Sequence, residues 1–253
     1  MAASLISNKA MAGSLEPPGP PSPTGASTGQ LASMIARPFG VSEPRMPLTG
    51  QPGTTSSLYE ISSAGSYCMT ENLVVPTGMN GLLISGDNVD LDMQGFHMLG
   101  SGGGTPGDFS VAISVTGQNV CISDGSIEGW AVGVQVDGPK FLLWDLTVLG
   151  CTIAGFRLNS DGQAYDCDVY TCPVGFDMHG VRSMAEECSA WSCPVSFQCN
   201  GSQNLIIGNT ATDSQSPFAI GPGNSFGPIV VVTGVGNIGA VAGSNHFLCN
   251  LVY

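Results

Sequence analysis

Two segments in successive copies of a 21-residue period decide the fold: Cys121-Ile-Ser-Asp-Gly-Ser-Ile-Glu-Gly129 and Leu142-Leu-Trp-Asp-Leu-Thr-Val-Leu-Gly150. The same pattern returns with the same period in three further copies, which begin at Gln163, Met184 and Leu205. Apolar positions alternate by two within each copy, as they do in β-strands. The chain therefore contains an internal repeat of short strands.

Equivalent positions of the copies are chemically alike, so each position forms a column. A coil of three short strands explains such columns, because successive coils stack at the usual strand spacing of about 4.8 Å. A leucine-rich repeat has a similar length, but its Leu-x-x-Leu-x-Leu signature is missing. We predict an all-β fold, a right-handed parallel β-helix that winds as a single solenoid with 21-residue coils. The clearest columns are Ile127, Val148, Val169, Ala190 and Ala211; Ile122, Leu143, Ala164, Ala185 and Ile206; Cys151, Cys172, Cys193 and Ser214; and Phe176, Phe197 and Phe218.

The chain divides into two regions by composition. Residues 1–57 hold nine of the seventeen prolines and predict an extended arm of polyproline character, which we expect to pack on its own domain or on a neighbouring subunit. Residues 58–253 form the predicted β-helix, with an insertion loop near 99–110 and a C-terminal cap near 217–253, where the repeat loosens.

The charge balance excludes several partners. The net charge is −13 and the chain has only six lysines and arginines, so clustered cations for nucleic acid are absent and polyanionic partners are disfavoured. No apolar stretch approaches the length of a membrane span, and the N-terminal segment shows no secretory signal. We expect either that a signal was removed or that the protein is made in the cytoplasm and reaches its site inside an assembly.

Several segments resemble bacterial, planctomycete-type proteins with right-handed parallel β-helix repeats. The resemblance rests on Leu15–Pro23, Ser42–Pro47, Ile61–Thr70, Asn88–Phe96 and the ending Asn245–Tyr253, and it covers most of the chain. More broadly, the chain resembles the pectate-lyase-like fold. That resemblance implies a fold shared by lyases, glycosidases, epimerases, phage tailspikes and passive adhesins, so it leaves the activity open.

The most regular polar column consists of carboxylates, each one repeat period after the last: Asp124, Asp145, Asp166 and Glu187. One interpretation is structural, because a tight turn between strands favours a residue that tolerates the left-handed αL conformation, as Asp does. The other is a cation site, because stacked carboxylates offer the oxygen ligands that Ca²⁺ prefers. We favour the turn interpretation; no cofactor is expected, and Ca²⁺ is the alternative.

The chain has nine cysteines, and because this number is odd at least one thiol is unpaired within a monomer. Stacked cysteines of adjacent coils come within disulfide range, but in-register parallel neighbours have an awkward torsion for that bond. Free cysteine is also a good small core residue. We favour buried thiols over disulfides, and no histidine joins these columns to make a metal site.

The candidate catalytic residues are two pairs, Asp166 with Asp168 and Asp177 with His179, because acid–base chemistry needs paired titratable groups. Neither pair is repeated, and no nearby Arg or Lys is evident in the sequence. We favour the interpretation that Asp177 and His179 are solvated turn residues.

Aromatic residues are the candidate carbohydrate-binding groups: Trp144, Tyr165 and Trp191. Trp144 and Tyr165 fall in one column, which suits stacking on sugars. Contact with a neighbouring subunit explains these aromatic residues equally well.

Two functional hypotheses follow. The first is a non-enzymatic structural or adhesive β-helix that assembles into a homo-oligomer, either a trimer or a fibre. It would belong to an extracellular, cell-surface or virion-like appendage and would have glycans as further partners. The second is a polysaccharide-processing enzyme, a lyase or glycosidase of the pectate-lyase-like type. The low charge and the lack of a convincing catalytic set favour the first.

Overall fold

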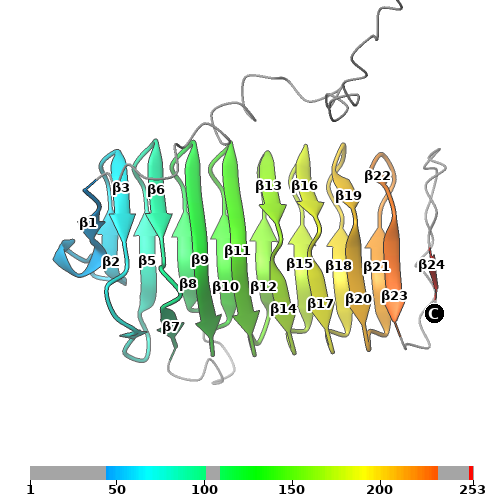
Figure 1. Cartoon of the computed structure of the whole chain (residues 1–253), viewed down its shortest axis with the longest axis horizontal. Coiled ribbons are helices and arrows are strands. Elements are labelled where there is room, and N and C mark those ends of the chain that lie inside the picture. The colour runs from blue at the N-terminus through cyan, green and yellow to red at the C-terminus, as the bar shows by residue number, and fades with distance from the viewer. Residues whose placement is uncertain (1–43, 101–108, 233–250, 253) are drawn as a thin grey trace, which may run out of the picture. The chain divides into compact units, whose positions relative to one another are not determined.

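The computed structural model describes residues 44–100, 109–232 and 251–252. Their strands pair in parallel with the strands of the coils before and after, and together they form a right-handed parallel β-helix (Figure 1). The one helix among these residues is a short 3-10 turn, Leu48–Gly50. The predicted fold class is confirmed.

One wall of the solenoid is an eight-stranded sheet with one strand from each coil. Each of its members pairs in parallel with its neighbours, in the order of the chain. The strands are β2 (Ser57–Ile61), β5 (Asn80–Ile84), β8 (Val111–Val115), β10 (Val132–Val136), β12 (Ala154–Leu158), β15 (Val174–Met178), β18 (Val195–Cys199) and β21 (Ser216–Ile220).

The remaining walls belong to a sixteen-stranded sheet that is bent along a corner. The long strands β9 (Val120–Glu128) and β11 (Phe141–Leu149) run through this corner and join both faces. The first face holds β1 (Met46–Pro47), β3 (Gly65–Cys68), β6 (Val89–Asp92), β13 (Gly162–Tyr165), β16 (Ser183–Glu186), β19 (Leu205–Ile207) and β22 (Ser225–Phe226). The second face holds β4 (Leu73–Val74), β7 (His97–Leu99), β14 (Asp168–Tyr170), β17 (Ser189–Trp191), β20 (Asn209–Thr212), β23 (Ile229–Val232) and β24 (Leu251–Val252).

The core consists of the predicted apolar columns. The column from Ile127 to Ala211 is fully buried, as is the column from Ile122 to Ile206. The predicted phenylalanine column is a continuous stack: the ring centroids of Phe176 and Phe197 lie 4.8 Å apart and those of Phe197 and Phe218 lie 4.9 Å apart. Burial of such side chains, coil upon coil, is the main stabilising contribution in a solenoid.

The predicted carboxylate column lies at the corner of the bent sheet. Asp124, Asp145, Asp166 and Glu187 all have positive φ, at 56°, 52°, 50° and 54°. Gly208 continues the column with φ 69°. The turn interpretation of this column is confirmed, because each residue adopts the αL conformation that a tight corner requires.

The 21-residue spacing holds throughout the bent sheet from β9 to β20 but not in the eight-stranded sheet. There, Val132 pairs with Ala154, and Ala154 pairs with Val174. The first of these spacings is one position longer than the period and the second is one position shorter, so a residue is gained and then lost between these coils. The change matters because a shift by one position turns a side chain to the other face of a sheet.

The N-terminal end of the solenoid is described from residue 44. Strand β1 pairs with β3, the side chain of Leu48 is fully buried, and the carbonyl of Pro52 accepts a hydrogen bond from the Glu60 N–H at 2.8 Å. Residues 44–57, which the sequence predicts as the end of the arm, therefore contact the first coil. The rest of the predicted arm, residues 1–43, lies outside the described residues.

The coil around the predicted insertion is longer than the others, since Leu82 on β5 pairs with Ile113 on β8, well beyond one repeat period along the chain. The loop residues 101–108 themselves lie outside the described residues. In the region predicted as a cap, β21, β22 and β23 continue the parallel pairing of the coils to Val232. Residues 233–250 of that cap are also outside the described part.

Candidate functional site

The carboxylates of the corner repel one another. Burial, followed by the charges of Asp124 and Asp166, raises the pKa of Asp145 above its ordinary value. Burial is also the largest cause that raises the pKa of Asp168, to which the charge of Asp166 adds. Among the described residues, the corner is thus a line of negative charge without a neighbouring cation to neutralise it.

The geometry of the described residues does not support the interpretation of this column as a cation site. In the described part of the chain, no three His, Cys, Asp or Glu side chains converge closely enough to hold a metal ion. The candidate Ca²⁺ ligands therefore lie one per coil along the corner and do not converge on one point: Asp124, Asp145, Asp166 and Glu187.

Exposed aromatic side chains flank this corner on both faces. Trp144 pairs with Tyr165 on the first face, as the shared column predicts, and Trp144 is 48% exposed. On the second face Tyr170 pairs with Trp191, which is 41% exposed, and their rings are 6.2 Å apart and nearly parallel. The predicted carbohydrate-binding residues thus lie in two rows: Trp144 and Tyr165 form one, and Trp191 forms the other together with Tyr170.

Tyr165 is tied to the carboxylate corner. Its hydroxyl donates a hydrogen bond to Glu187 Oε2 at 2.7 Å, and this bond is the main cause that raises the pKa of Tyr165 to about 12. The ring is therefore held in one orientation beside the corner. An aromatic row with a fixed ring and adjacent carboxylates can stack on a sugar and accept hydrogen bonds from its hydroxyls.

The second predicted catalytic pair lies on a different wall. Asp177 is in β15 of the eight-stranded sheet and only 4% exposed, so the prediction that it is a solvated turn residue is wrong. A cation does stand beside it, contrary to the sequence prediction: Arg157 Nε lies 3.3 Å from Asp177 Oδ2. The spacing between β12 and β15 falls one short of the repeat period, so Arg157 pairs with Asp177; the full period would have placed it opposite the buried Met178.

His179 completes this cluster. Its Nε2 lies 2.7 Å from Asp177 Oδ1, and its side chain is 46% exposed. Asp177 Oδ1 is buried and has no other partner among the described residues. Two coils before His179, Asp137 accepts hydrogen bonds from the side-chain amides of Gln135 at 2.9 Å and Asn159 at 2.7 Å.

The four candidate catalytic residues therefore form two separate groups. Asp166 and Asp168 flank the buried Cys167 beside the corner of the bent sheet, whereas Asp177 and His179 belong to the eight-stranded wall and its edge. The structure does not bring the two pairs together into one site.

The cysteines within the described residues form no disulfide, and most are buried. In the predicted cysteine column the Cys151 N–H donates a hydrogen bond to Cys172 Sγ at 3.3 Å. Burial raises the pKa of Cys193 and that of Cys199, each to about 11. These thiols serve as small core residues.

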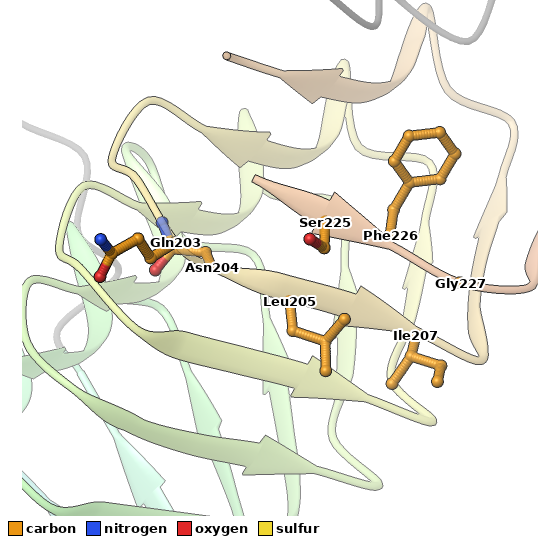
Figure 2. A pocket seen from close by; sticks show the side chains of 7 residues that line it. All are labelled: Gln203, Asn204, Leu205, Ile207, Ser225, Phe226 and Gly227. Carbon is orange, nitrogen blue, oxygen red and sulfur yellow. The ribbon is translucent and has the colours of Figure 1, made fainter. Parts of the chain in front are cut away.

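A shallow hollow of about 370 Å³ lies at the far end of the first face. Figure 2 shows its lining, with Leu205 and Ile207 on β19 and Ser225 and Phe226 on β22. None of the predicted site residues contributes to it. The described residues contain no helix with the length and hydrophobicity that a membrane crossing requires.

Comparison with known proteins bears on the fold alone. No family model and no curated protein matches the chain. Among solved structures, the crystal structure of the pectate lyase Pel9A is similar, with a TM-score of 0.36 and 11% sequence identity over 77% of this chain and 71% of that one. The β-helix architecture of the described residues rests on the parallel pairing of their coils.

Proposed function

We propose that the chain is a non-enzymatic adhesive β-helix that binds glycans along the corner of its bent sheet. The observation that carries this proposal is the pair of aromatic rows on either side of a line of carboxylates, Trp144 with Tyr165 and Tyr170 with Trp191, in each of which the tryptophan is exposed and the tyrosine is half-buried. Large aromatic side chains that remain exposed together on a protein surface are typical of a binding site.

The charge of the surface narrows the glycan class. The corner carboxylates have no cationic partner among the described residues, and the net charge of the chain is −13. An acidic glycan would be repelled, so the partner is a neutral or amino-bearing polysaccharide.

The test is affinity electrophoresis of the purified chain in gels that contain neutral or amino-bearing polysaccharides. Trp191→Ala and Trp144→Ala should each weaken the retardation several-fold, because each removes a stacking surface. Phe109→Ala is the matched control, since Phe109 is also exposed but lies outside both rows. Equal retardation of all variants, or none with any polysaccharide, would contradict the proposal.

We further propose that the protein works as a homo-oligomer, either a trimer or a fibre, in an extracellular, cell-surface or virion-like appendage of the bacterial type that its sequence resembles. A rigid rod with few surface charges suits such a role. Size-exclusion chromatography with light scattering tests it, and a monomer at micromolar concentration would contradict this part of the proposal.

A polysaccharide-processing enzyme is the second candidate, favoured by the proximity of Asp166 and Asp168 beside the aromatic rows. Burial raises the pKa of Asp168, which suits a general acid beside a second carboxyl group. Screening for lyase and hydrolase products on neutral and acidic glycans tests this candidate. Activity that the Asp166→Ala, Asp168→Ala double variant abolishes would support it, and activity that survives that change would remove its best site.

A further inference from the structure

We propose that Arg157 and His179, held by the buried carboxylate of Asp177, bind one small oxyanion, such as a carboxylate or sulfate group, on the outer side of the eight-stranded sheet. The proposal is independent of glycan binding at the corner, because none of its residues belongs to the aromatic rows.

The fold itself does not require a charged pair at this position. Asp177 and Arg157 belong to one column of the eight-stranded sheet, whose other members in neighbouring coils are neutral: Ser114, Gln135, Gln198 and Ala219. Burying a carboxylate is costly even when it is paired, and here Oδ1 has no partner besides the imidazole of His179 at 2.7 Å. The neighbouring coils avoid the desolvation cost of a buried carboxylate, so its presence here indicates a function for the Arg157–Asp177 pair.

The donors that Asp177 leaves available point to the ligand. Arg157 donates a hydrogen bond to Asp177 through Nε, which leaves the two terminal nitrogens of the guanidinium as donors for a ligand. The Arg157 side chain is 29% exposed and that of His179 is 46% exposed, while Asp177 lies beneath them. A guanidinium and an imidazole that share one exposed surface offer hydrogen-bond donors to two oxygens of a planar or tetrahedral anion.

The surroundings set the size of the anion that fits. The flanking side chains of the two adjacent columns are amides: Gln135 beside Arg157, Gln198 beside Asp177, and Asn159 and Asn200 beside His179. Asp137, in the coil before that of Arg157, has both of its carboxylate oxygens occupied by amide hydrogen bonds. The cluster therefore suits a single anionic group, whereas a polyanion would meet the negative charge of the whole chain.

Asp177 is a positioning residue in this arrangement. Its Oδ2 fixes the guanidinium and its Oδ1 faces the imidazole, so both donor groups are oriented before the anion arrives. Preorganised donors of this kind bind more tightly than the same groups on free side chains.

The experiment is a proton NMR titration of the full chain with sodium sulfate, a uronic acid monosaccharide and a sulfated monosaccharide, at pH 6 and constant ionic strength with chloride. The imidazole resonances of His179 are identified by their loss in His179→Gln. We expect them to shift saturably with sulfate, and the two sugar arms show which source of the oxyanion is preferred.

The variants separate binding from a purely structural role. Arg157→Gln, which introduces the residue found in neighbouring coils, should weaken sulfate binding at least tenfold, and Arg157→Lys should weaken it less. Arg182→Gln is the matched control: Arg182 is 61% exposed and lies 3.7 Å from Asp161, outside the cluster. Asp177→Asn should weaken binding while the folded chain, checked by circular dichroism, persists.

Two outcomes would overturn the proposal. One is the absence of a saturable shift of the His179 resonances with all three anions. The other is an unchanged sulfate affinity in folded Arg157→Lys and Arg157→Gln chains. Trp191→Ala should leave the sulfate titration unchanged, so failure of the glycan proposal and failure of this one can be told apart.

Discussion

The rings of Phe156 and Phe176 stack with their centroids 5.0 Å apart and 11° between their planes, although their spacing along the chain falls one short of the repeat period. The phenylalanine stack therefore has four members, of which the 21-residue spacing reveals three. All four side chains are fully buried. The stack joins four coils through one continuous set of contacts.

Removal of one ring should open a cavity in this stack. Phe176→Ala is expected to lower the free energy of unfolding by about 3–5 kcal/mol, because both the buried area and the contacts with Phe156 and Phe197 are lost. Urea unfolding followed by circular dichroism measures the change. Phe109→Ala, at an exposed position, should change it by less than about 0.5 kcal/mol, and equal effects of the two substitutions would contradict the prediction.

The corner carboxylates should make stability depend on pH. The pKa of Asp145 is raised in the folded chain, so the folded state binds this proton more tightly than the unfolded state does. Its contribution to stability is therefore present below the unfolded pKa and is lost as the pH rises through the raised folded pKa. Asp145→Asn, which keeps a residue that tolerates αL, should slightly raise the melting temperature at pH 7 and have no such effect at pH 3.

Asp145→Ala is the matched control for the corner conformation. It removes the same charge but places a residue at φ 52° that disfavours the left-handed region by about 1 kcal/mol or more. The alanine variant should therefore melt below the asparagine variant at both pH values. If the two melt together, the corner does not depend on αL tolerance.

Asn209 replaces cysteine in the column that contains Cys167 and Cys188, and its amide satisfies the backbone of the preceding coil. Its Oδ1 accepts from the Cys188 N–H at 2.8 Å and its Nδ2 donates to the Ala185 carbonyl at 2.8 Å. Asn209→Ala leaves the buried Cys188 N–H without its acceptor and removes one donor from the Ala185 carbonyl, and should cost roughly 1–3 kcal/mol in urea unfolding. Thr210→Ala, one position along β20, should cost much less, and a similar loss in both would contradict this role.

The buried thiols should resist alkylation in the folded chain. The pKa of Cys193 and of Cys199 is raised to about 11 by burial, so little thiolate exists at pH 8. Iodoacetamide labelling, mapped by mass spectrometry, should be much slower at these residues in buffer than in urea. The partly exposed Cys121 serves as the internal reference and should react first. Equal labelling rates in buffer and urea would show that these thiols are accessible.

The repeat predicts most of the fold because stacked coils repeat their chemistry. The columns at Ile127 and Ile122, the carboxylate corner and the pairing of Trp144 with Tyr165 all follow from the 21-residue period. The Arg157–Asp177 pair could not be predicted in this way, since it depends on a spacing one short of that period in one sheet. A period found in one wall of a solenoid does not determine the register of another wall, because the corners can absorb a residue.

Proline residues lie at the outer edge of the first coil. Pro47 is in the terminal strand β1, and Pro52 accepts the Glu60 N–H that β2 would otherwise offer to a further strand. Proline itself has no N–H to donate to an incoming strand. This end of the rod is therefore closed to strand addition within the described residues, and association of copies should proceed side by side through the walls instead of by growth of the sheets from this end.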